Sequence, residues 1–112
     1  MPIPDAQRAI ASREKVHGYL LNHEHPDGGS KAVWFASLGY EQDDWQTLAS
    51  DLLKIAKTCL QYDTELSAHG VKYKTSGSIC CPGHRSGSVI TVWIVEDKDP
   101  PRLITAYPDA SS

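Results

Sequence analysis

Two histidines and a lysine flank a glycine-rich turn in the first third of the chain, where His23, His25 and Lys31 border residues 26–29. Proline and glycine disfavour a helix in the turn, and the residues after it favour one. A helix start presents free N–H groups and partial positive charge, so with Lys31 it could bind an anionic oxygen. His25 could act as a general base at neutral pH. The alternative is an exposed turn without a chemical role.

Two hydroxyl side chains near the end of the chain, Thr105 and Tyr107, are separated by one residue. In a strand, such a pair projects from one face, and Ile104 and Ala106 then project from the other. Two hydroxyls on one face could bind a phosphate group or orient a reacting hydroxyl. The alternative is that both are ordinary strand residues, because Thr and Tyr are common in sheets.

A third candidate is the pair His84 and Arg85, in the segment between two predicted strands. An arginine can bind a phosphate through two parallel hydrogen bonds, so we predict that Lys31, His84 and Arg85 contact phosphate. Arginine is also common in exposed loops that have no such role.

A zinc site is the fourth possibility, since several residues have suitable side chains: His23, His25, Cys80, Cys81 and His84. Structural zinc sites place cysteines two to four residues apart or histidines three to five apart, and adjacent cysteines in a strand point to opposite faces. The spacing therefore argues against zinc, and we predict neither a metal ion nor a cofactor.

The elements that must position these residues begin with two helices. Ser12 is a suitable N-cap for a first helix that reaches about Asn22, and Ser30 is one for a short helix from Lys31 to about Leu38, closed by Gly39. The first helix places three residues on one face, namely Val16, Tyr19 and Leu20.

The strongest helical pattern runs from Asp43 or Asp44 to about Gln61. Apolar residues recur there at steps of three and four: Trp45, Leu48, Leu52, Ile55 and Cys59. This stripe is predicted to be core. The two aspartates are suited to cap the helix and complement its dipole, which gives them a structural role.

From Gly70 onward, the sequence has short β-rich runs separated by Gly and Pro: residues 71–80, 88–97 and 101–107. The intervening segments have the length of hairpin loops, so the runs predict a consecutive antiparallel meander. The run Val89–Val95 is almost wholly apolar and is predicted to be its central strand. The predicted fold class is α+β, with the N-terminal helices packed on one face of the C-terminal sheet.

Composition bounds the class of protein. The chain has 112 residues, 40% hydrophobic and 22% charged, which predicts one folded domain over 1–112 with an ordered core of about 8–108 and frayed ends at Met1–Asp5 and Asp109–Ser112. The net charge of -3 divides into -4 for residues 1–65 and +1 for residues 66–112. Nucleic-acid binders are usually more basic, so any polyanion site is expected as a local patch on the C-terminal half.

The expected location is the cytoplasm, because no stretch has the length of a membrane helix and the N-terminus has no hydrophobic signal-peptide core. The three cysteines, Cys59, Cys80 and Cys81, are an odd number with two adjacent members. They make a poor disulfide framework and are expected to be reduced thiols.

Several blocks together resemble a small uncharacterised bacterial domain family: YLLNHEHPDGGSKAVWFASLGY, DDWQTLASDLL, HGVKYKTSGSI and TVWIVEDKDPPRLITAYP. The resemblance covers about residues 10–108, and HPDGGSKA and PRLITAYP are its most specific motifs. A looser similarity, carried by the terminal T-A-Y-P strand after helices and a meander, is to the ribonuclease toxins of the barnase, EndoU, colicin D and RelE group.

The looser similarity implies RNA cleavage without a metal ion. In EndoU-like members, histidines, a lysine and a Thr-x-Tyr pair carry the reaction; Thr105 and Tyr107 match that pair, His25 one histidine, and Lys31 or Lys72 the lysine. His69 and His84 stay open for the second histidine. The implied partners are RNA and a protein inhibitor. The alternatives are a non-catalytic, antitoxin-like or accessory protein-binding module of the same fold and, third, a zinc-stabilised protein.

Overall fold

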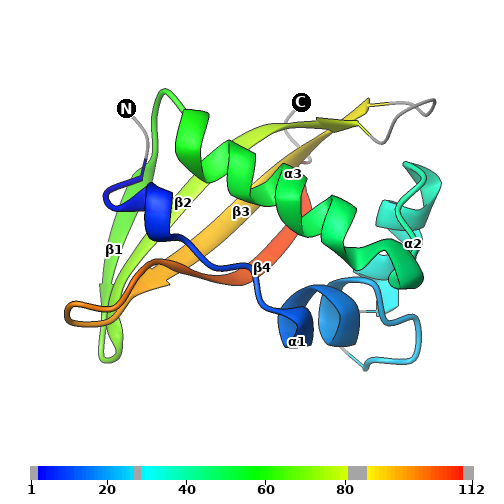
Figure 1. Ribbon diagram of the computed structural model, residues 1–112, viewed down its shortest axis with the longest axis horizontal. Helices are drawn as coiled ribbons and strands as arrows, with labels where there is room; N and C mark the ends of the chain where they lie inside the picture. The colour runs from blue at the N-terminus through cyan, green and yellow to red at the C-terminus, as the bar shows by residue number, and fades with distance from the viewer. Residues whose placement is uncertain (1–2, 27–28, 81–85, 110–112) are drawn as a thin grey trace.

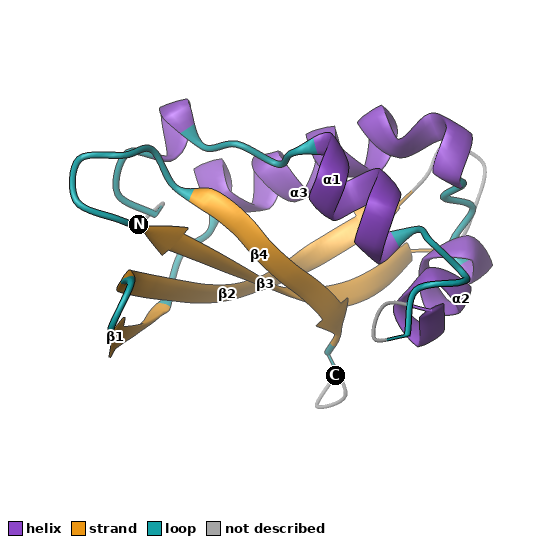
Figure 2. Cartoon of the chain, turned by 90° about the horizontal axis from the view of Figure 1, so that it is seen from below, coloured by secondary structure: helices purple, strands orange, loops and turns teal. Residues whose placement is uncertain are grey.

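The helices lie on one face of an antiparallel sheet, so the chain forms two layers (Figures 1 and 2). The computed structural model describes residues 3–26, 29–80 and 86–109. Within them, the α-helices and the strands follow one another in this order: α1 Arg13–Lys15, α2 Gly29–Ser37, α3 Trp45–Thr58, β1 Asp63–Ser67, β2 Gly70–Cys80, β3 Ser86–Val95 and β4 Arg102–Pro108. The predicted α+β class, with helices on one face of a meander, is confirmed.

The first helix begins where the sequence predicts and ends early. The Ser12 hydroxyl accepts a hydrogen bond from the Lys15 N–H at 3.3 Å, so Ser12 is the N-cap of α1. The chain then continues as a π-helical turn, Val16–Leu20, in which Val16 and Leu20 are fully buried. The helix thus ends two residues before the predicted Asn22.

The second helix starts earlier than predicted. Since α2 begins at Gly29, Ser30 lies inside its first turn, and the prediction that Ser30 caps the helix is wrong. Ala32 and Phe35 turn toward the core. Gly39 closes the helix as predicted, because its φ of 96° lies in the left-handed region that glycine adopts most easily.

The third helix carries the predicted apolar stripe. Leu48, Leu52, Ile55 and Cys59 are buried and Trp45 packs against the same core. A short 3-10 turn, Gln42–Asp44, precedes α3, and Asp44 stands at its N-cap without a side-chain capping hydrogen bond. The predicted capping role of the aspartates is therefore wrong for Asp44.

The sheet has four strands within the described residues, in the order β1-β2-β3-β4, and every neighbouring pair is antiparallel. The three predicted strands are present and β3 is central. The strand β1 is an addition that the sequence did not predict. Its residues are mostly exposed and show no alternation of apolar and polar side chains, so the strand exists because it pairs with β2.

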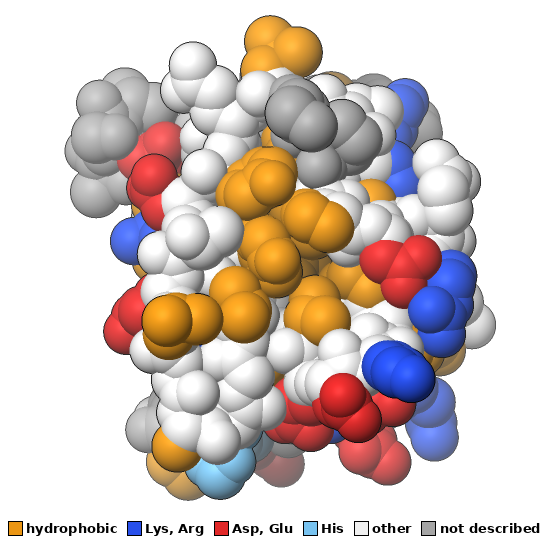
Figure 3. All heavy atoms as spheres, turned by 90° about the vertical axis from the view of Figure 1, so that its left-hand side faces the viewer, with side chains coloured by type: hydrophobic (Ala, Val, Ile, Leu, Met, Phe, Trp, Pro, Cys, Tyr) orange, Lys and Arg blue, Asp and Glu red, His pale blue; other side chains and the backbone are white. Residues whose placement is uncertain are grey.

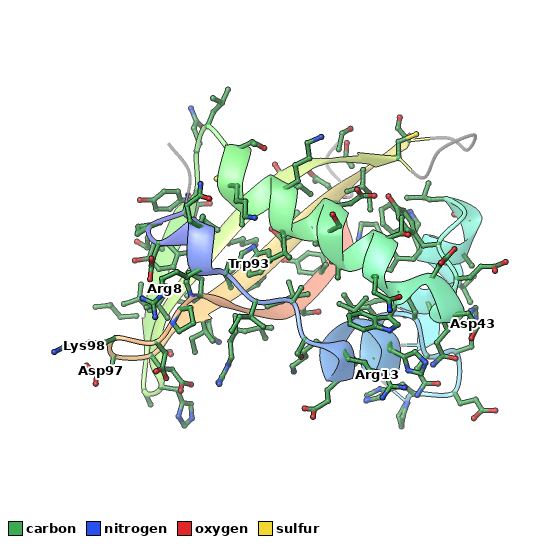
Figure 4. The ribbon with its side chains drawn as sticks, viewed as in Figure 1. Arg8, Arg13, Asp43, Trp93, Asp97 and Lys98 are labelled. Carbon is green, nitrogen blue, oxygen red and sulfur yellow. The ribbon has the colours of Figure 1, made fainter. Side chains whose placement is uncertain are left out.

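Trp93 lies between α3 and the sheet (Figure 4) and is fully buried. Its indole Nε1–H donates a 3.0 Å hydrogen bond to the Thr91 hydroxyl, so the polar atom of this large core side chain is paired. Gly77 lets α3 approach β2, because a Cβ there would lie 2.9 Å from the side chain of Ile55. The two layers therefore meet at near contact distance at Gly77.

The last strand is irregular at Ile104. Leu103 pairs with Trp93 and Thr105 pairs with Val92, so Ile104 is an extra residue in β4. Ile104 lines the same hollow as Thr105 and Tyr107, and the prediction that it shares a face with Ala106 is wrong. The prediction that Thr105 and Tyr107 share a face is confirmed.

The described residues before α1 are packed against the rest of the domain. Ile3, in the segment that was expected to fray, is 1% exposed, and its N–H donates a 3.1 Å hydrogen bond to the Ala56 carbonyl in α3. The residues before α1 also contact the sheet, because Ile10 forms a parallel bridge with Arg102 of β4.

Candidate functional site

Tyr19, in the π-helical turn after α1, is the centre of a polar cluster at the edge of β4. Its hydroxyl lies 3.4 Å from the Thr105 hydroxyl. The His25 ring packs edge-on against the Tyr19 ring with centroids 4.9 Å apart. The ammonium nitrogen of Lys31 lies 5.2 Å from the ring centre, and that of Lys15 lies 5.7 Å away. Three predicted site residues, His25, Lys31 and Thr105, therefore contact one tyrosine.

Local hydrogen bonds hold the turn that carries His25. The Asn22 side chain donates to the Gly18 carbonyl at 3.2 Å and accepts from the Glu24 N–H at 3.0 Å. The N–H of Gly29 donates to the His25 carbonyl at 2.9 Å. A Cβ at Gly29 would lie 2.9 Å from the backbone oxygen of His23, so this close approach requires glycine. The turn thereby places His25 against Tyr19.

Tyr107 lies farther along β4, on the open face of the sheet. The ammonium nitrogen of Lys74 in β2 is 6.0 Å from its ring centre. Both residues line a hollow of about 470 Å³ that extends across the strands. Nine residues line it: Asp63, Thr64, Glu65, Lys72, Lys74, Val92, Ile104, Thr105 and Tyr107. Thr105 belongs to both the Tyr19 cluster and this hollow, so the two features are contiguous.

The other candidates lie elsewhere. His84 and Arg85 are outside the described residues. His69 is in the β1–β2 turn and does not line the hollow, whereas Lys72, the alternative lysine, does. His23 is exposed. The structure thus brings His25 and Lys31, which flank the glycine-rich turn, together with Thr105 around Tyr19, and the roles of the four predicted catalytic residues remain predictions.

The sequence matches the family described as "Domain of unknown function (DUF6883)" over residues 2–110.

The chain belongs to this family.

A chain from the contact-dependent growth inhibition toxin–immunity protein complex of Klebsiella pneumoniae 342 is similar in structure to this DUF6883 domain, with a TM-score of 0.73. The alignment covers 95% of this chain and 97% of that chain at 14% identity. At this identity the similarity establishes a shared fold. No curated protein matches the sequence.

The central residue of the cluster in this DUF6883 domain, Tyr19, was missed as a site residue by the sequence analysis. The helical pattern places it on the buried face of the first helix with Val16 and Leu20, and it is half-buried there. The available signal was its hydroxyl, because a partly buried tyrosine usually has a polar partner. That partner, Thr105, is 86 residues away and could not be deduced from spacing.

Three basic side chains lie near Tyr19 or on the helix before it. Lys15 and Lys31 both lie over the Tyr19 ring, and Arg13, labelled in Figure 4, belongs to the same short helix as Lys15. In the described ranges the ion pairs are Arg8–Asp5 and Arg102–Glu96, each at 2.8 Å, so neither Lys15 nor Lys74 pairs with a carboxylate there. Both ammonium groups are exposed to incoming anions.

A metal centre has no support in the part of the chain that the structure describes, where no group of three or more His, Cys, Asp and Glu side chains could hold an ion. Two of the five zinc candidates, Cys81 and His84, lie outside that part. Cys59 is a buried free thiol and Cys80 an exposed one.

A larger hollow, of about 660 Å³, lies between the C-terminal half of α3 and β2. None of the predicted site residues lines it apart from Cys80, a member of the disfavoured zinc set. As for membranes, no helix among residues 3–26, 29–80 and 86–109 has the length and apolar character needed to cross one.

Proposed function

We propose that this DUF6883 chain is a toxin-type ribonuclease domain that cleaves RNA without a metal ion. The observation that supports this most is the convergence of His25, Lys31 and Thr105 on Tyr19. A general base, a cation and a hydroxyl from three separate segments meet there, and a cyclising cleavage of RNA uses such groups together with a general acid. The fold shared with a chain of a growth-inhibition toxin–immunity complex supports the same class.

In the proposed reaction, His25 takes the proton of a ribose 2′-hydroxyl, and the 2′-oxygen attacks the neighbouring phosphorus. The new O2′–P bond forms as the P–O5′ bond breaks, giving a 2′,3′-cyclic phosphate and a 5′-hydroxyl end. Lys31 stabilises the negative charge that grows on the phosphoryl oxygens, and the hydroxyls of Thr105 and Tyr107 donate hydrogen bonds to them. The leaving 5′-oxygen takes a proton from a general acid.

The principal test incubates purified protein with total tRNA in EDTA, beside the His25→Ala and Tyr107→Phe variants. The wild type is expected to produce fragments with cyclic phosphate ends. Loss of the base lowers the rate about 10²–10⁴-fold. The matched control is Lys98→Ala, since Lys98 lies in the β3–β4 turn at one end of the molecule, well separated from Arg13 of α1 (Figure 4). Absence of wild-type cleavage contradicts the proposal.

The general acid is identified with a substrate that does not need one. A ribonucleoside 3′-(p-nitrophenyl phosphate) releases a stable phenolate, so loss of the acid should leave its cleavage intact while loss of the base should not. His69→Ala and His84→Ala are compared on RNA and on this ester. The variant that loses RNA cleavage and retains ester cleavage contains the altered acid.

A non-catalytic protein-binding module is the second candidate. Hydrophobic side chains gather at the centre of the face shown in Figure 3. Leu66 on the edge strand β1 and Leu60 before it are 85% and 86% exposed, and exposed apolar groups beside an unpaired strand edge are typical of protein interfaces. A protein inhibitor of the ribonuclease could dock there too. High expression tolerated without an inhibitor, together with no tRNA cleavage, would favour the module.

A further inference from the structure

We propose that the open face of the sheet binds an unpaired RNA nucleotide next to the scissile phosphate, with the Tyr107 ring stacked on its base and Lys74 at its phosphate. This inference rests on the proposed ribonuclease function and adds the substrate class and the residues that hold it. The hollow beside Thr105 would be a substrate-binding site continuous with the Tyr19 cluster.

Strand register places the relevant side chains in two adjacent rows on one face. Lys74 pairs with Val92, which pairs with Thr105. Two residues away along each strand, Ser76 pairs with Ile90, which pairs with Tyr107. Paired residues and residues two apart in a strand share a face. Lys74, Thr105 and Tyr107 therefore project together, away from the helix layer.

The shape of the hollow suits a base. Val92 and Ile104 give it an apolar floor, and the half-buried Tyr107 ring gives it an aromatic surface. Stacking of a base on an aromatic side chain is the usual means by which proteins hold single strands, and it does not depend on sequence. The ammonium nitrogen of Lys74 lies over the Tyr107 ring, 6.0 Å from its centre, and could contact the phosphate of a nucleotide whose base stacks on this ring.

Charge across this face indicates where the backbone of the RNA runs. Asp63 and Glu65 of β1 pair in register with Lys74 and Lys72 of β2, so the β1 side of the hollow is acidic. The β4 side carries Thr105 and leads to Lys15 and Lys31. Phosphates are therefore expected over β2–β4 and toward the Tyr19 cluster, and repelled from β1.

Unpaired RNA fits this arrangement better than a duplex. A base can stack on Tyr107 only if its face is free, whereas in a helix both faces are covered by neighbouring base pairs. The few cations on this face would give a duplex limited electrostatic attraction in a chain whose net charge is -3.

The test measures binding in the His25→Ala background, where cleavage is silenced. A fluorescein-labelled single-stranded hexanucleotide and the same sequence inside a hairpin stem are titrated, and anisotropy is recorded at several salt concentrations. Tyr107→Leu is expected to weaken hexamer binding about 10-fold, because the ring carries the stacking. Lys74→Ala should lower the salt dependence by about one unit of slope. Lys57→Ala, on the exposed side of α3, is the matched control and should change neither quantity.

Each outcome of this experiment either supports or overturns the proposal. Unchanged hexamer binding in both Tyr107→Leu and Lys74→Ala overturns the proposal, and so does a stem bound as tightly as the hexamer. If neither RNA binds but a protein partner is lost on changing Lys74 or Tyr107, the face is a protein interface and the inference is wrong. Hexamer binding as expected with no wild-type cleavage would refute the ribonuclease and leave the binding site standing. If the wild type cleaves RNA and neither Lys74→Ala nor Tyr107→Leu raises the KM, the binding site is refuted and the ribonuclease proposal stands.

Discussion

The two faces of the sheet are built from alternate residues of the same strands, and they differ in kind. On the face under the helices, Trp93, Thr91, Leu103 and Ala106 are at most 2% exposed, and the indole N–H has its partner. On the open face, Lys74 and the half-buried Thr105 and Tyr107 offer charge, hydroxyls and an aromatic ring to solvent. Residues that fill the core and residues that are accessible to a ligand therefore occur within the same strand, on opposite faces.

The largest effect on stability is expected at Trp93. Trp93→Ala leaves a cavity under α3 and should lower the free energy of unfolding by about 3–5 kcal/mol. Chemical denaturation followed by circular dichroism measures it. A loss below about 1 kcal/mol would mean that the covered face is not the stabilising one.

A second substitution examines the contact between layers. Gly77→Val should lower the free energy of unfolding by up to about 3 kcal/mol, because its side chain meets Ile55 under α3. Gly18→Ala is the matched control, since nothing lies within 4 Å of the added Cβ. Equal thermal stability of the two variants would contradict close packing over β2.

The polar pair in the core should matter less. Thr91→Val leaves the buried Trp93 indole N–H without its hydroxyl partner, at a cost of about 1–2 kcal/mol. Thr64, on the exposed edge strand, makes no side-chain hydrogen bond within the described residues, so Thr64→Val serves as the control in the same thermal melts. If Thr64→Val costs as much, the difference between the faces is not one of buried hydrogen bonds.

The smallest effect on stability is expected on the open face. Lys74→Ala and Tyr107→Phe should each change the free energy of unfolding by less than about 0.5 kcal/mol, because surface substitutions remove little packing. Under the proposed function, Tyr107→Phe nevertheless lowers the rate of tRNA cleavage. A stability loss comparable with that of Trp93→Ala would show that this face is structural after all.

Much of the fold follows from periodicity. The stripe of α3 and the apolar run of β3 were predicted because burial on one side of a helix, or in the centre of a sheet, dictates residue type directly. The strand β1 was not predicted, because its pairing with β2 and not its own composition makes it extended. The cap at Asp44 failed for a similar reason: a preceding 3-10 turn sets the entry to α3.

Most residues of the candidate site could be predicted from the sequence, but Tyr19, which they contact, could not. His25, Lys31 and Thr105 were selected by residue type and local context, and the structure brings them together. Tyr19 and Lys74 were not selected, because one follows a core pattern and the other an ordinary strand pattern. What distinguishes them is their contacts with distant segments, which single-sequence patterns do not encode.

The extra residue at Ile104 determines which face of the sheet carries Thr105 and Tyr107. Had β4 paired one to one with β3 from Leu103 onward, Thr105 would stand opposite Thr91 and Tyr107 opposite Val89, facing α3. One additional residue moves every following side chain of β4 to the other face of the sheet. A single extra residue thus determines the face of the sheet on which Thr105 and Tyr107 lie. Deleting one residue at this point would move both hydroxyls from the open face to the face covered by α3.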